Sequence, residues 1–210
     1  SYWRFEYFLA VTQGTLSDPR SSGGDSNDGK QVSGRLGVVL SPGFILGASL
    51  ARGPYLRDSL RDTLRSVGAG VEDFHQRAIG FDAEFGYRHF ALVGELILNR
   101  WEAPGIHGNR LETWDLDATG WYVEGKYTIS PGLYGAARYG RIDFSKVDDG
   151  AGNRLCWDDP IQRWEYGVGY HFRDGVIGKL IRQDVRVTHD FHTRGTASEH
   201  FHAIQLSISF

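Results

Sequence analysis

The sequence predicts an all-β fold, a transmembrane antiparallel up-and-down β-barrel with ten strands in this chain and a single domain over residues 1–210. Three observations favour this fold. Apolar and polar side chains alternate along most of the chain, long connections alternate with short ones, and the composition suits strands and turns. The 210 residues include 28 glycines, 13% aromatic residues, one cysteine and no methionine.

The first half of the chain contains five predicted strands, at residues 3–12, 32–40, 44–50, 79–87 and 90–99. The second and third join at Ser41-Pro42-Gly43 and the fourth and fifth at Arg88-His89, and both joints are short enough for a tight hairpin. Residues 14–30, rich in Ser, Gly, Asp and Asn, are expected to form a long loop. Residues 53–75 and 103–115 are expected to be long connections.

The second half contains five more, at residues 119–127, 133–139, 163–172, 176–189 and 199–210. Short turns are predicted at Ser130-Pro131-Gly132 and Arg173-Asp174-Gly175, and longer connections at 145–160 and around 193–195. The alternation slips near Arg141, where we expect a β-bulge. Its phase is undetermined over residues 179–183, because no strict alternation is present there.

A soluble β-sandwich also alternates, but two features argue against it. Charged side chains occur in mid-strand opposite the apolar faces, and they could not all lie in a dry core. The apolar faces also end on aromatic residues, as the interfacial girdles of membrane barrels do. These aromatic residues are Trp3, Tyr87, Trp101, Trp121, Tyr139, Trp164 and Phe210.

The last strand places Ile204, Leu206, Ile208 and Phe210 on one face. In this it resembles Gram-negative outer-membrane β-barrels, which end on a membrane-facing strand with a terminal Phe. Residues 121–125, 134–139, 163–170 and 204–210 are similar to the C-terminal part of phosphate-selective porins, a resemblance that covers residues 121–210 well and the rest only in pattern.

The resemblance implies an outer-membrane location, contact with lipid and lipopolysaccharide, and a homotrimer of barrels with about sixteen strands. The ten strands would then be the C-terminal part of a larger barrel, which the abrupt start at Ser1 favours. The strand count alone leaves a closed ten-stranded barrel open.

The inward face of the predicted barrel carries charges of both signs. In a wide barrel they would line an aqueous lumen, so the sequence predicts a porin or porin-like channel for passive diffusion of small hydrophilic or ionic solutes, with no enzymatic activity and no cofactor. In a narrow barrel they would pair and fill the lumen, and the external loops would carry a protease-like or binding function. The predicted pore-lining residues are Arg4, Glu6, Arg35, Asp82, Glu84, Glu95, Glu124, Lys126, Arg138, Arg163, Glu165, Asp184 and Arg186.

Arginines recur every fourth residue in the connection after the third strand, at Arg57, Arg61 and Arg65, beside a ridge of leucines. This pattern predicts a short amphipathic helix. An inward-folded helix would attract anions, whereas a solvated one would cap the barrel, with Asp58 and Asp62 offsetting its charge. The arginine ladder of phosphate-selective porins has no residue-by-residue match, so phosphate selectivity is not expected.

Histidines gather near the last hairpin, at 189, 192, 200 and 202. Such spacing suits a transition metal but also an ordinary polar rim, and we expect no metal site. Asp190 and His192 resemble the Asp-x-His pair of outer-membrane proteases, but the second acidic pair that those enzymes need is not recognisable. A net charge of −3 with scattered basic residues excludes a general affinity for nucleic acid.

Overall fold

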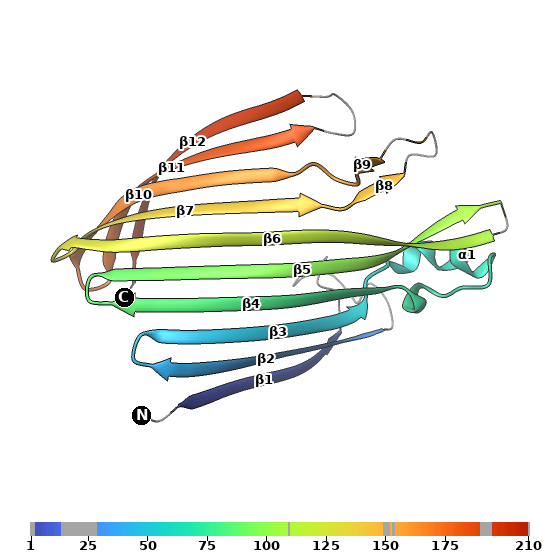
Figure 1. Ribbon diagram of the computed structural model, residues 1–210, viewed down its shortest axis with the longest axis horizontal. Helices are drawn as coiled ribbons and strands as arrows, with labels where there is room; N and C mark the ends of the chain where they lie inside the picture. The colour runs from blue at the N-terminus through green and yellow to red at the C-terminus, as the bar shows by residue number, and fades with distance from the viewer. Residues whose placement is uncertain are drawn as a thin grey trace.

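The computed structural model describes residues 3–13, 29–108, 110–148, 152, 154–189 and 195–209. Ten strands form one antiparallel sheet in which each strand pairs with the next along the chain, and two short strands form a separate hairpin (Figure 1). The large sheet contains β1 (Arg4–Gln13), β2 (Lys30–Ser41), β3 (Phe44–Pro54), β4 (His75–Tyr87), β5 (Phe90–His107), β6 (Arg110–Ser130), β7 (Leu133–Phe144), β10 (Ile161–Arg173), β11 (Val176–His189) and β12 (Gly195–Ile208). The separate hairpin pairs β8 (Lys146–Asp148) with β9 (Arg154–Cys156).

All four predicted short turns are confirmed. They join β2 to β3, β4 to β5, β6 to β7 and β10 to β11, and all four lie at the same end of the sheet (Figure 1). Gly43, Gly132 and Gly175 have φ of 84°, 84° and 78°, which glycine adopts without the steric cost of a Cβ. Arg88, at φ 53°, occupies the corresponding region in the remaining turn.

The prediction of a long connection at residues 103–115 was wrong. β5 and β6 stay paired as far as His107 and Arg110, and Pro104 lies opposite Thr113 within this extension. The Trp114 ring packs over Gly105, 3.3 Å from the point where a Cβ would stand. A glycine that interrupts the alternation in sequence therefore provides room for an aromatic ring.

The predicted bulge near Arg141 is also absent. β7 pairs without interruption through Arg141 on both of its sides. The register shifts instead near short turns, for example between Thr128 and Ser130. Arg141 breaks the apolar pattern because it meets Asp143, not because the backbone changes phase.

Residues 55–74 pack as a small unit of their own, and the predicted short helix is confirmed there. It comprises η1 (Asp58–Leu60), α1 (Arg61–Arg65) and η2 (Val71–Asp73) around a core of Leu56, Leu64, Val71 and Phe74. Leu111 of the β5–β6 extension packs against this core, and the Tyr55 hydroxyl donates a hydrogen bond to the Glu102 carbonyl at 3.1 Å. No helix of the described residues is long and apolar enough to cross a bilayer.

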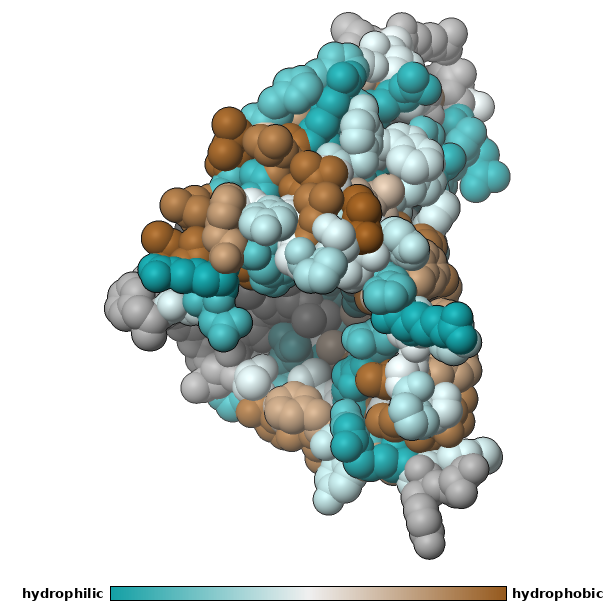
Figure 2. Space-filling model, turned by 90° about the vertical axis from the view of Figure 1, so that its left-hand side faces the viewer, coloured by the Kyte–Doolittle hydropathy of each residue, from teal (hydrophilic) through white to brown (hydrophobic). Residues whose placement is uncertain are grey.

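The large sheet is strongly curved. Seen from the end that carries the short turns, it curls around a hollow (Figure 2). Its two edges are β1 and β12, and within the described residues neither pairs with a second neighbour in the sheet.

Candidate functional site

The register divides the sheet into two chemically different faces. Residues directly opposite one another on neighbouring antiparallel strands share a face, and successive residues alternate between faces. Eleven of the thirteen predicted pore-lining residues fall on one face by this rule, which we call the charged face: Arg4, Glu6, Arg35, Asp82, Glu84, Glu95, Glu124, Lys126, Arg138, Arg163 and Glu165.

The other two, Asp184 and Arg186, lie on the opposite face, which we call the apolar face. Asp184 is directly across from Trp164 and His200. Its Oδ2 accepts a hydrogen bond from the Tyr166 hydroxyl at 3.1 Å. Its Oδ1 accepts one from Arg182 Nε at 3.1 Å and lies 2.6 Å from His200 Nδ1. The sequence could not assign this phase because Leu180 and Ile181 are consecutive apolar residues.

The structure adds four residues to the charged face that the sequence analysis did not select: Tyr122, Tyr134, Lys179 and Glu199. Lys179 lies in the segment of undetermined phase. The role of the two tyrosines emerges only from their contacts. The ring of Tyr122 supports Arg138 at 3.7 Å, and that of Tyr134 supports Lys126 at 4.0 Å.

The charged face is the face turned towards the hollow. Ala51, Gln76 and Ala118 are almost fully buried and lie on this face, as expected where side chains converge on the inside of a curved sheet. Many large side chains of the apolar face are well exposed, such as Leu50 and Phe81.

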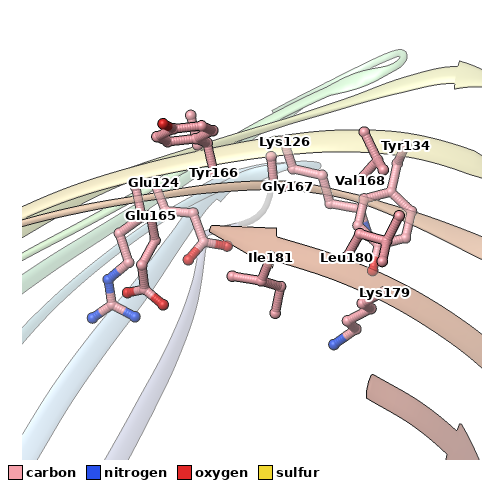
Figure 3. Close-up of a pocket in the computed structure, with 13 residues that line it drawn as sticks. Glu124, Lys126, Tyr134, Glu165, Tyr166, Gly167, Val168, Lys179, Leu180 and Ile181 are labelled. Carbon is pink, nitrogen blue, oxygen red and sulfur yellow. The ribbon is translucent and has the colours of Figure 1, made fainter. Parts of the chain in front are cut away.

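Arg138 is the centre of the charged face on β6, β7 and β10. It lies directly opposite Glu124 on one side and Glu165 on the other. Arg163 Nε adds an ion pair to Glu165 at 3.1 Å. Glu124, Arg138 and Glu165 border an open cavity of about 300 Å³ (Figure 3). Figure 3 shows Glu165 and Lys179 projecting from one side of the sheet and Tyr166 from the other. Charged side chains of both signs are thus exposed at this cavity.

On β4 to β6 the charges of this face lie in the half of the strands nearer the short turns, whereas Arg163 and Glu165 of β10 lie nearer the opposite end. The other half of the charged face carries small residues, among them Ala51, Ala78 and Gly80, and forms a shallow cavity of about 280 Å³ that Phe8 and Ile97 also line.

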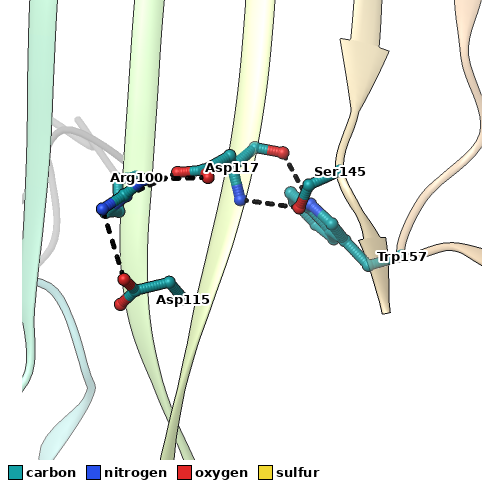
Figure 4. Close-up of polar contacts among 5 residues, drawn as sticks. All are labelled: Arg100, Asp115, Asp117, Ser145 and Trp157. Carbon is teal, nitrogen blue, oxygen red and sulfur yellow. Dashed lines mark hydrogen bonds and ion pairs between the residues drawn. The ribbon is translucent and has the colours of Figure 1, made fainter. Parts of the chain in front are cut away.

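The connection between β7 and β10 folds over the charged face in the half that is away from the short turns. Trp157 makes edge contacts with Trp101 and Phe144, at 5.4 and 4.8 Å between ring centroids, and both of these residues lie on the charged face. Its indole Nε1–H donates to the Asp117 carbonyl at 2.8 Å, while the Ser145 hydroxyl accepts from the Asp117 N–H (Figure 4). The sequence analysis had expected Trp101 in an apolar girdle, and that assignment was wrong.

The apolar face carries an apolar band whose border runs obliquely to the strands. On each strand we take the border at the first charged, amide or imidazole side chain on the side of the band away from the short turns. These residues are Arg52 on β3, Arg77 on β4, Arg100 on β5, Asp117 on β6, Arg141 on β7, Gln162 on β10, Arg182 on β11 and His202 on β12. The first four are successive cross-strand partners. Arg141 instead pairs with Trp121, four residues nearer the turns than Asp117, and Arg182 pairs with Tyr166, four nearer than Gln162.

This border therefore moves eight residues towards the short turns over the six interstrand spacings from β3 to β11. At about 3.3 Å per residue and about 4.8 Å per spacing, the shift corresponds to an angle of roughly 40° between the strands and the normal to the band. Aromatic contacts lie along the border, where Tyr139 stacks between Trp121 and Trp164 at 5.3 and 4.5 Å.

The three loop arginines lie apart from the charged face, in and beside the 55–74 unit. Arg61 donates to Asp58 at 2.6 Å and to Glu72 at 2.8 Å, and its hydrogen bond to Asp58 raises its pKa. Arg57 precedes η1, and Arg65 ends α1. The two carboxylates around Arg61 offset its charge and favour a structural role over attraction of anions.

The histidines do not assemble a metal site among the residues that the structure describes. His200 and His202 share the apolar face and lie opposite Asp184 and Arg182, respectively. Asp190 and His192, the protease-like pair, lie outside the described residues.

The fold and its two faces define a class, the curved antiparallel β-sheets of sequentially paired strands with one charged and one apolar face. Among solved structures, the chain is similar to OmpF of Salmonella typhi in complex with daunomycin, with a TM-score of 0.63, 14% identity, and coverage of 98% of this chain and 57% of that one. The chain thus spans little more than half the length of OmpF, and at this identity the likeness shows the fold alone. No protein-family model and no curated protein matches the sequence.

Proposed function

We propose that this chain forms part of the wall of an outer-membrane, porin-like channel for passive diffusion of small hydrophilic or ionic solutes. The observation that carries the proposal is the oblique apolar band. Strands of a transmembrane barrel tilt by about 35–45° from the barrel axis, and a lipid layer perpendicular to that axis must cross them at the same angle. The measured slope of roughly 40° agrees with this geometry.

The width of the band supports the same orientation. On β4 it extends from Ile79 to Tyr87, nine residues, which is close to the span of about 9–11 residues that a tilted strand needs to cross the hydrocarbon. A soluble sandwich would cover such a face with a second sheet. In the described chain, by contrast, many large side chains of the apolar face are exposed.

The charged face supports an aqueous lumen. Cations and carboxylates alternate around Arg138 and remain partly exposed to the hollow, which suits solutes that keep their hydration shell. Because both signs are present, we propose weak rather than strict ion selectivity, without an enzymatic step.

A lipid environment requires every backbone group of the wall to be paired, so the free edges of β1 and β12 must be closed. We propose that further strands complete the wall, as in the larger OmpF chain, giving a barrel of about sixteen strands with room for a water-filled channel. Direct pairing of β1 with β12 would give a ten-stranded barrel that its own side chains nearly fill. Assembly into trimers, as the resemblance to porins implies, is part of the proposal.

Planar-bilayer recording of the purified, folded protein tests this function. Discrete conductance steps are expected, with a reversal potential in a salt gradient that reports the weak selectivity. Folded protein that inserts into the bilayer but gives no conductance would overturn the channel proposal and favour a filled, narrow barrel whose function lies in its loops.

A further inference from the structure

Three arginines stand side by side at the border of the apolar band. Arg52 on β3 is directly opposite Arg77 on β4, which in turn is directly opposite Arg100 on β5. Side chains directly opposite one another have Cβ atoms about 4.5–5.5 Å apart, and like charges at that distance destabilise a sheet. The row therefore needs negative charge beside it.

Among the residues that the structure describes, only one end of the row has carboxylates beside it. Arg100 donates to both oxygens of Asp117, at 2.6 and 3.0 Å, and lies 3.3 Å from Asp115 (Figure 4). Glu102, the next acidic residue, accepts a hydrogen bond from the His75 backbone at 3.0 Å and lies 3.6 Å from the His75 ring. Arg52 and Arg77 are exposed, and neither forms an ion pair within the described part of the chain.

Other border arginines differ in this respect. Arg141 on β7 makes two hydrogen bonds to Asp143, at 2.6 and 2.7 Å. Arg182 on β11 donates to Asp184 at 3.1 Å. The protein therefore neutralises its border arginines where it carries a carboxylate nearby, and the pair Arg52–Arg77 is the exception in the described sheet.

The surroundings indicate what kind of anion fits. Directly below this pair, towards the short turns, lie Leu50 and Ile79, which face each other across the strands and belong to the apolar band. Leu50 is 53% exposed. An anion bound here has an apolar surface immediately beneath it, a combination that matches a charged headgroup attached to acyl chains rather than a free inorganic ion.

We propose that Arg52 and Arg77, flanked by Arg100, bind the phosphate of a lipid headgroup, with the acyl chains lying along Leu50 and Ile79. Guanidinium groups match phosphate because they donate two parallel, charge-assisted hydrogen bonds. The inference rests on the proposed membrane orientation of the wall but not on conductance, because the site lies on the face opposite the lumen.

Native mass spectrometry of the full chain in neutral detergent tests the site with three probes: dioleoyl phosphatidic acid, dioleoylglycerol and inorganic phosphate. Phosphatidic acid is expected to bind, and the double substitution Arg52→Ser and Arg77→Ser is expected to weaken it by about 10-fold or more, as the loss of two charge-assisted hydrogen bonds implies. Arg141→Ser, at a border arginine that has its own carboxylate, is the matched control and should bind as the wild type does.

Three results would overturn the proposal: unchanged phosphatidic acid binding in the double variant, equal binding of dioleoylglycerol, or equal occupancy by inorganic phosphate at the same concentration. A second variant, Arg52→Lys with Arg77→Lys, keeps both charges but not the paired hydrogen bonds, so its binding should lie between those of the wild type and the serine variant, which separates loss of the site from loss of folding. Conductance of the serine variant should equal that of the wild type, so a failure of the channel proposal is recognised separately.

Discussion

Arg35 and Asp82 form a bidentate ion pair that passes over a strand lying between them. Arg35 belongs to β2 and Asp82 to β4, and Arg35 reaches the two carboxylate oxygens at 3.2 and 2.5 Å. The residue of β3 beneath the pair is Gly47, and a Cβ built there would collide with both partners. The pair thus fastens three strands together at a point where the middle strand has no side chain.

Gly47→Ala should therefore destabilise the wall by about 1–2 kcal/mol, because the added methyl group displaces the pair or leaves one of the charges unpaired. Thermal unfolding followed by circular dichroism measures the effect. Gly120→Ala is the matched control, since it lies on the same face of β6 and its Cβ would meet only Ile142 at 3.8 Å. Equal losses in the two variants would contradict the assigned role of Gly47.

Arg138→Ser should shift the selectivity of the proposed channel towards cations. Glu124 and Glu165 would face the lumen without the cation between them. A change of about 2- to 5-fold in the cation-to-anion permeability ratio is expected, because salt screens such charges over about 8–10 Å.

The reversal potential measures this shift, and Glu165→Gln should move it in the opposite direction. Arg141→Ser, on the apolar face, should leave it unchanged. An equal shift in the Arg141 variant would mean that the two faces have been assigned the wrong way round.

Trp157→Ala should release the connection between β7 and β10 from the wall. It removes the hydrogen bond to Asp117 and the ring contacts with Trp101 and Phe144. Cleavage by trypsin after Arg154 should accelerate by about 10-fold or more, as a local loss of about 2 kcal/mol implies. Trp157→Phe keeps ring contacts but not the donor, so its rate should be intermediate, and mass spectrometry of the fragments identifies the site.

Tyr55 makes the stability of the 55–74 unit depend on alkaline pH. Burial, and secondarily the charge of Glu102, raises the pKa of Tyr55 from 10.0 to about 12. A raised pKa means that the folded state favours the neutral phenol, so its stabilising effect is complete below pH 10 and disappears as the pH rises towards 12.

Tyr55→Phe should consequently unfold at a lower temperature than the wild type at pH 8, by an amount that shrinks above pH 10. The measurement is the difference in melting temperature between the two proteins at successive pH values. A difference that stays constant up to pH 12 would contradict the raised pKa.

The strands that the sequence located well are those with two different faces. Residues 176–189 were predicted as a strand and form β11 with the same bounds, and the first strand differs by one residue at either end. Alternation is informative there because one face meets apolar surroundings and the other meets water. The short turns were equally clear, since Pro fixes φ and Gly adopts the positive φ that these turns require.

The errors arose where a partner strand, not the local sequence, determines the structure. Pro104 and Gly105 indicate a loop. In the described sheet, however, β5 pairs with β4 only as far as Trp101, so at Pro104 its one neighbour is β6 and the missing N–H of Pro104 costs no hydrogen bond on the unpaired side. Around Leu180 and Ile181 both faces are apolar, and the side on which Asp184 lies is decided by its pairing with Trp164. The sequence thus located most of the charged face but not the docking of Trp157 or the row of border arginines.

The oblique border of the apolar band also limits where the chain can gain length. The border shifts in steps of four residues, from β6 to β7 and from β10 to β11, so two residues added to a strand or a short turn would displace every later strand relative to the proposed lipid layer. Residues 66–70 are free of this constraint, and at Gly68, with φ of 83°, no atom lies within 4 Å of the position of a Cβ. An affinity tag or a fluorescent peptide inserted at Gly68 should leave the wall in register, and it offers a handle for following assembly on living cells.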